Sequence, residues 1–142
     1  MSIYDQGKII ADELGEALVP RARVQYYPAE APVECCDECP ILDWWVGPIT
    51  PREIDDWDCT PLDALVHFRL SVCFPTIDDD GNFDHDAALV VAIKMADYVT
   101  IAAKLLQDIA CTSQRMAFFG AQIAQPQGGC LTAALQIKVV VT

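Results

Sequence analysis

The sequence predicts an α+β fold in which a mixed or antiparallel β-sheet is backed by two helices. Two observations support this prediction. From Leu131 to Val141 every odd position is apolar, which is the period of a strand with one buried face. From Ala87 to Ile109 the chain is mostly apolar over a length that suits a helix. A chain of 142 residues is expected to form one domain, residues 1–142.

The N-terminal part of the chain predicts a helix, a short strand and a long irregular segment. Apolar residues at helical spacing predict a helix from about Ser2 to Leu18, which Pro20 ends. A short strand is expected at Arg23–Tyr27. The segment Ala29–Pro61 is rich in proline, cysteine, tryptophan and acidic residues. We therefore expect a long irregular Cys/Trp-rich loop there, with a weak strand around Ile41–Val46.

The middle of the chain predicts a strand followed by the long helix. Apolar residues alternate from Ala64 to Phe74, so one face of this strand is expected to lie in the core, while His67, Arg69 and Ser71 point to the other face. An acidic loop follows. Asp84 or Asp86 is expected to cap the long helix, because a carboxylate accepts the unpaired N–H groups of a first helical turn.

The C-terminal part predicts a β-hairpin. The run Ala117–Gln125 is typical of a strand, and it precedes the alternating strand Leu131–Thr142. The connection between them contains Gln127, Gly128 and Gly129. This glycine pair lacks the Lys-Ser/Thr and the following helix of a phosphate-binding loop, so it indicates backbone freedom at a turn.

Charge and composition exclude several classes of function. Nine basic residues against 21 acidic ones give a net charge of −12, which disfavours binding to a phosphate backbone. The first residues do not form a basic stretch followed by an apolar core, so we expect no secretory signal and a protein made in the cytosol. The long helix carries four charges, which argues against a membrane span. They are Lys94, Asp97, Lys104 and Asp108.

The cysteines allow three interpretations. Cys36 and Cys39 have the two-residue gap with which two thiolates grip one zinc ion, and Cys35 or Cys59 could complete a tetrahedral set. A second such pair is missing from the sequence. The preferred interpretation is therefore that the thiols are buried or idle, with zinc and disulfides as alternatives.

The sequence predicts no catalytic site and no cofactor. Its two histidines, His67 and His85, lie on different predicted elements, and no Ser or Cys has the context of an activated nucleophile. Alternating acidic residues at 78–86 could contact calcium, but they do not follow the EF-hand pattern, so a loop and helix cap are favoured. Trp44, Trp45 and Trp57 are candidates for an interaction surface, with local packing as the alternative.

Three short motifs resemble those of small neck proteins of long-tailed phages of actinobacteria, especially the tail terminator. They are Cys-Cys-Asp-Glu-Cys at 35–39, Cys-Phe-Pro at 73–75 and Gln-Pro-Gln-Gly-Gly-Cys at 125–130. With the helix between them, the resemblance spans roughly residues 24–142. The acidic, Trp-rich segment 42–61 departs from that family's pattern.

The resemblance implies a structural virion protein with no catalytic activity. Such proteins form homohexameric rings at the head-proximal end of the tail tube, where they end tail polymerisation. The implied partners are the major tail tube protein on one face and the head-completion or stopper protein on the other. DNA passes through the ring without specific binding. The implied location is the virion neck, assembled in the host cytoplasm.

Within such a ring, the three tryptophans and the turn residues Gln127, Gly128 and Gly129 are candidates for the lumen or for subunit contacts. Asp78, Asp79 and Asp80 are expected at the lumen, because like charge lets DNA slide without sticking. Alternative functions are another neck ring, either a stopper or an adaptor, and a small zinc-binding adaptor module.

Overall fold

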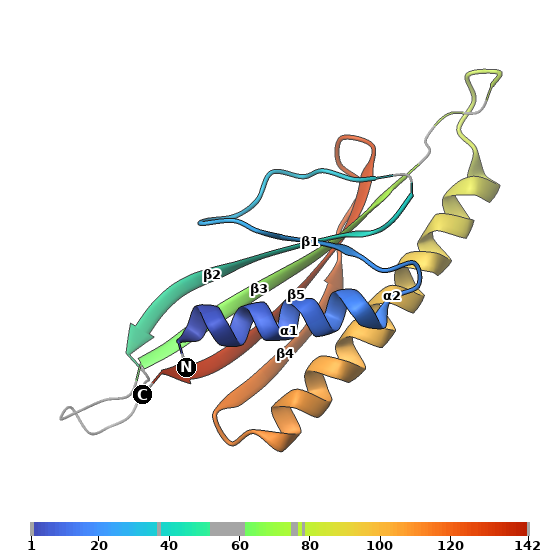
Figure 1. Cartoon of the computed structure of the whole chain (residues 1–142). Coiled ribbons are helices and arrows are strands. Elements are labelled where there is room, and N and C mark those ends of the chain that lie inside the picture. Colours follow the sequence, from blue (N-terminus) through green and yellow to red (C-terminus); the bar gives the residue numbers. More distant parts are fainter. Residues whose placement is uncertain (1, 37, 52–61, 75–76, 78, 142) are drawn as a thin grey trace.

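The structure is a computed structural model that describes residues 2–36, 38–51, 62–74, 77 and 79–141. The described part forms two helices and five strands (Figure 1). In chain order they are α1 (Ile3–Ala17), β1 (Arg23–Tyr26), β2 (Ile41–Pro51), β3 (Leu62–Cys73), α2 (His85–Thr112), β4 (Met116–Ile123) and β5 (Cys130–Val141).

The strands form one mixed sheet in the order β1-β2-β3-β5-β4. The first two strands are parallel, and the other neighbouring pairs are antiparallel. β4 and β5 form the predicted C-terminal hairpin, in which the register shifts between Phe118 and Ala121 at the positive-φ residue Gly120. The predicted α+β fold is thereby confirmed.

Both helices cover the same face of the sheet (Figure 1). The predicted alternation of β3 and β5 supplies the centre of the core, where Phe68 and Leu135 face each other across the two strands and are buried. α1 contributes Leu14 and α2 contributes Leu106, both also buried. Burial of such large apolar side chains is the main stabilising contribution to the fold.

The helix ends follow the capping signals in the sequence. Ser2 and Asp5 form a reciprocal capping box at α1, in which the Asp5 amide donates to the Ser2 hydroxyl and the Ser2 amide donates to the Asp5 carboxylate. At α2 the Asp84 carboxylate accepts from the amide of Ala87. Of the two aspartates considered for this cap, Asp84 is therefore the one that acts.

The segment expected to be a long loop contains a full strand. β2 runs from Ile41 to Pro51, well beyond the weak strand expected at 41–46. Trp44 and Trp45 therefore lie on a strand and not in a loop, and their side chains point to opposite faces of the sheet. Trp57 lies outside the described residues.

The face of the sheet away from the helices is partly covered by the segment 27–40, which connects β1 to β2. Arg69 donates from Nη2 to the carbonyls of Ala31 and Pro32 at 2.7 and 2.8 Å, and it also contacts the Asp43 carboxylate at 3.3 Å. Arg69 and Asp43 are only 7% and 1% exposed. The expectation that β3 has one buried face is thus incomplete, because Arg69 and Ser71 are buried beneath this segment.

A disulfide between Cys35 and Cys130 fixes the same segment to the start of β5. It joins residues that are 95 positions apart in the sequence. Arg69 and this disulfide therefore anchor segment 27–40 at two points. In the ranges that the structure covers, neither helix is long and apolar enough to cross a membrane.

Candidate functional site

A cluster of exposed apolar side chains lies at the N-terminal end of α2. Leu89, Val90 and Ile93 are 60%, 66% and 55% exposed, and Phe83 just before the helix is 49% exposed. We call these four residues the α2 tip. The buried side chains of α2 all lie at or beyond Met95, and Figure 1 shows the first turns of the helix extending past the end of the sheet. Phe83 makes an edge-to-face contact with the His85 ring, but all four side chains keep about half or more of their surface exposed.

The α2 tip differs from the rest of the solvent-facing side of the helix. Further along, Asp97, Lys104 and Asp108 lie on about the same side as Val90, because their spacings approach whole helical turns. A solvated helix face is normally polar in this way. Ile101 on the same side is also 40% exposed, but the tip gathers the three most exposed large apolar side chains of the helix, and such a cluster is typical of a contact surface.

The acidic loop before α2 adjoins this tip. Asp79 and Asp80 are exposed, as a lumen position would require, whereas Asp78 lies outside the described residues. Their assignment to a lumen stays a prediction. The calcium alternative gains no support, because the described part of the chain contains no cluster of three or more His, Cys, Asp or Glu residues that could hold a metal ion.

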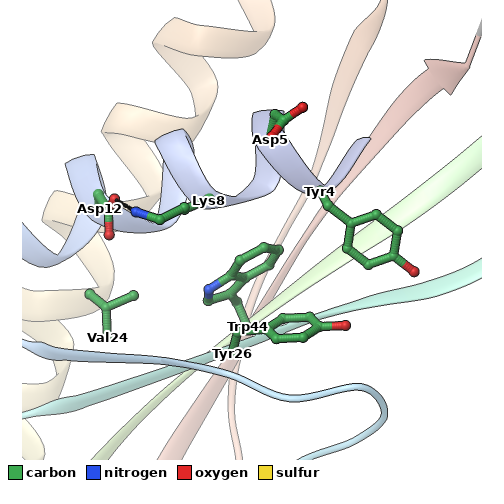
Figure 2. A pocket seen from close by; sticks show the side chains of 7 residues that line it. All are labelled: Tyr4, Asp5, Lys8, Asp12, Val24, Tyr26 and Trp44. Atoms are coloured by element: carbon green, nitrogen blue, oxygen red, sulfur yellow. Dashed lines mark hydrogen bonds and ion pairs between the residues drawn. The ribbon is translucent and has the colours of Figure 1, made fainter. Parts of the chain in front are cut away.

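A second candidate surface is a pocket of about 470 Å³ between α1, β1 and β2 (Figure 2). Its aromatic wall consists of Tyr4, Tyr26 and Trp44. The Tyr26 ring lies 4.9 Å from the Trp44 ring and 6.1 Å from the Tyr4 ring, centroid to centroid. Both tyrosines are about half exposed, at 49% each, so the wall is open to solvent.

The position of Trp44 explains how this pocket is built. A side chain at Gly7 would place its Cβ 2.6 Å from the Trp44 ring, so the glycine lets α1 approach the indole closely. Trp44 is only 5% exposed. This burial fits the packing alternative for Trp44, because contact with α1 takes up most of its surface, and its part in an interface stays a prediction. The pocket rim carries Lys8 and Asp12, which form an ion pair of 2.7 Å on the exposed side of α1.

Trp45 belongs to a separate stack on the opposite face of the sheet. Its ring is parallel to His67, with centroids 5.3 Å apart, and the Arg69 guanidinium lies 5.4 Å from the Trp45 ring. Gly47 leaves room for the imidazole, since a Cβ there would collide with His67. This arrangement supports a packing role for Trp45, and the Glu30 carboxylate interacts electrostatically with His67.

Burial lowers the pKa of His67 below its usual value of about 6.5. The unfolded chain therefore takes up a proton at higher pH than the folded protein does, so we expect the free energy of unfolding to fall as the pH drops from 7.5 to 5.5. Urea denaturation at both pH values measures this. His67→Gln should flatten the dependence, and an unchanged dependence in that variant would contradict the assignment.

The turn residues named from the sequence form the connection between β4 and β5. Gln127 and Cys130 are joined by two backbone hydrogen bonds of 2.8 and 3.0 Å, and Gly128 and Gly129 have φ values of 59° and 75°. Left-handed backbone of this kind favours glycine, which confirms that the pair serves a turn. Their use in a subunit contact stays a prediction.

The proposed four-cysteine zinc set does not form. Cys35 is in the disulfide with Cys130, so it cannot supply a thiolate, and Cys59 lies outside the described residues. Cys36 and Cys39 are reduced and lie together, with Sγ atoms 3.8 Å apart. The disulfide alternative is therefore correct for one pair, Cys35 and Cys130. The sequence could not indicate this pairing, because no other cysteine lies close to Cys130 in the chain.

Sequence reasoning missed the aromatic pocket altogether. Tyr4 lies in the first helix, Tyr26 ends a short strand and Trp44 lies in the weak strand expected around Ile41–Val46, so no spacing connects them. Only the parallel pairing that sets Tyr26 beside Trp44 brings them together. In comparisons with known proteins, no family model and no curated protein matches this chain.

Proposed function

We propose that this chain is a structural subunit of a phage head–tail neck, a tail terminator that assembles into a homohexameric ring. The exposed α2 tip carries this proposal, because a helix end with three large aliphatic side chains more than half exposed is costly in water unless a partner covers it. A copy of the same chain is the partner that ring assembly supplies.

A closed ring needs two different patches on each subunit, one of which meets the other on the next copy. The α2 tip and the aromatic pocket are two such patches, and they lie on separate elements (Figures 1 and 2). We assign the pocket of one subunit as the receiving surface for the α2 tip of the next. Open aromatic rings are common anchors at protein interfaces.

The charge of the chain fits a passive role toward DNA. A net charge of −12 disfavours tight binding to the phosphate backbone, and exposed acidic residues such as Asp79 would keep a channel from holding DNA. The tail tube protein and the stopper or head-completion protein are the proposed partners on the two faces of the ring. Another neck ring, a stopper or an adaptor, is the alternative within the same particle.

The ring is tested by the double substitution Leu89→Glu and Ile93→Glu, with the assembled species measured by mass photometry. We expect a hexamer for the unchanged protein and monomers for the variant. Each buried contact of this size contributes about 2 kcal/mol, so each substitution should weaken association roughly 30-fold. Gln107→Glu, on the same helix but outside the tip, is the charge control and should leave the ring intact.

The receiving surface has its own test. Tyr4→Ala with Tyr26→Ala should weaken ring formation while circular dichroism shows an unchanged fold, because both side chains are half exposed. Rings that survive this change would contradict the pocket assignment alone. An unchanged protein that remains monomeric at high concentration, and that labelled antibodies do not locate at the neck of a virion, would overturn the proposed function.

A further inference from the structure

Cys36 and Cys39 form a closely spaced pair of reduced thiols beside a cavity. Their Sγ atoms are 3.8 Å apart, and the Cys39 thiol donates to the Cys36 sulfur. Both side chains are half-buried, and both line a cavity of about 510 Å³ whose wall also includes Lys94 and Gly129. The pair is thus reachable from solvent through a space large enough for a small molecule.

The two thiols have different surroundings. The backbone N–H groups of Glu38 and Cys39 donate to the Cys36 sulfur, and these hydrogen bonds, with that from the Cys39 thiol, lower the pKa of Cys36. Burial raises the pKa of Cys39. Cys36 is therefore the better nucleophile, whereas Cys39 holds its proton and donates it to its neighbour. This asymmetry is typical of a Cys-X-X-Cys pair that reacts with disulfides.

A metal explains this pair less well than thiol chemistry does. Zinc prefers four ligands, and the described part of the chain offers no third His, Cys, Asp or Glu residue in position to share an ion with these two sulfurs. The two sulfurs are already in contact at 3.8 Å, and a disulfide requires them to approach to roughly 2 Å.

We propose that Cys36 and Cys39 form a redox-active dithiol that closes to a second disulfide by exchange with a low-molecular-weight disulfide, with Cys36 as the attacking sulfur. This site is independent of the proposed ring function. It lies next to the Cys35–Cys130 disulfide, so its oxidation would add a second covalent constraint to segment 27–40.

The exchange proceeds in two steps. The Cys36 thiolate attacks one sulfur of the small disulfide RSSR, which forms Cys36–S–S–R and expels RS⁻. Cys39 then gives its proton to solvent and attacks the Cys36 sulfur, which expels the second RS⁻. The expelled thiolates take up two protons. The protein dithiol is oxidised by two electrons, and the small disulfide is reduced by the same two electrons to two RSH.

The test uses the purified full-length protein and bis(2-hydroxyethyl) disulfide, a neutral reagent that the charge of −12 does not repel. After reaction, the remaining thiols are alkylated and the alkylated residues are mapped by mass spectrometry. We expect Cys36 and Cys39 to lose their alkylation together, at least about tenfold faster than the exposed Cys111. Cys39→Ser should instead accumulate a stable mixed disulfide at Cys36.

Matched variants separate this result from general thiol reactivity. Cys111→Ser and Cys73→Ser should leave closure of the pair unchanged, whereas Cys36→Ser should abolish rapid reaction at this site. Reaction at Cys36 no faster than at Cys111 would overturn the proposal. So would a product in which Cys36 is joined to Cys73, or zinc that protects both thiols from alkylation at one ion per chain.

Discussion

Replacing Arg69 with alanine should lower the free energy of unfolding by about 4 kcal/mol, because it leaves a buried carboxylate without its charged partner. Asp43 is 1% exposed and contacts Arg69 at 3.3 Å. The same guanidinium also satisfies the carbonyls of Ala31 and Pro32, which would lose these hydrogen bonds. Urea denaturation followed by fluorescence measures the change.

Two further variants test whether the loss of stability in Arg69→Ala comes from the buried ion pair. Arg21→Ala removes an exposed ion pair with Glu16, and it should change stability by less than about 0.5 kcal/mol. Asp43→Asn in the Arg69→Ala background should restore part of the loss, because burial already raises the pKa of Asp43 and a neutral amide carries no charge into the interior. If Arg69→Ala is as stable as Arg21→Ala, the buried pair does not anchor this segment.

Replacing Cys35 with serine should cost about 4 kcal/mol under oxidising conditions. The disulfide to Cys130 spans 95 positions, and a crosslink that closes so long a loop greatly restricts the unfolded chain. Unfolding of the unchanged protein with and without a reducing agent measures the same contribution independently. Cys111→Ser is the control, since that thiol is exposed on α2.

The two anchors should not act independently. Arg69 and the disulfide hold the same segment, 27–40, so the double variant should lose less stability than the sum of the single losses. A strictly additive double variant would mean that the two anchors stabilise separate parts of the structure. Equal stability with and without reductant would contradict the contribution assigned to the disulfide.

The sequence predicted those elements well whose apolar residues recur with the period of one strand or one helix. β3 and β5 alternate cleanly, and their apolar faces are buried as expected from Phe68 and Leu135. The long helix is predicted from its composition and from two candidate caps, Asp84 and Asp86, of which the structure uses Asp84. In each case the signal lies within the element itself, because a strand or helix with one apolar face is expected to turn that face toward the core.

The features that the sequence did not predict depend on contacts between distant segments. The burial of Arg69 requires that segment 27–40 folds over β3, and nothing near residue 69 indicates it. The Cys35–Cys130 disulfide and the aromatic pocket likewise join residues from separate elements. The α2 tip has a partial signal in the sequence, because a helix that is mostly apolar apart from four charges needs cover on more than one side.

The edges of the sheet have a consequence for how copies of this chain meet. β1 offers only four residues, and the outer strand β4 is interrupted where its register shifts at Gly120. A short or broken edge is a poor template for another strand, so backbone pairing between copies cannot continue from one molecule to the next. Contacts made by side chains, such as those proposed for the α2 tip, can stop at a fixed number of subunits, so these edges guard against open-ended fibres.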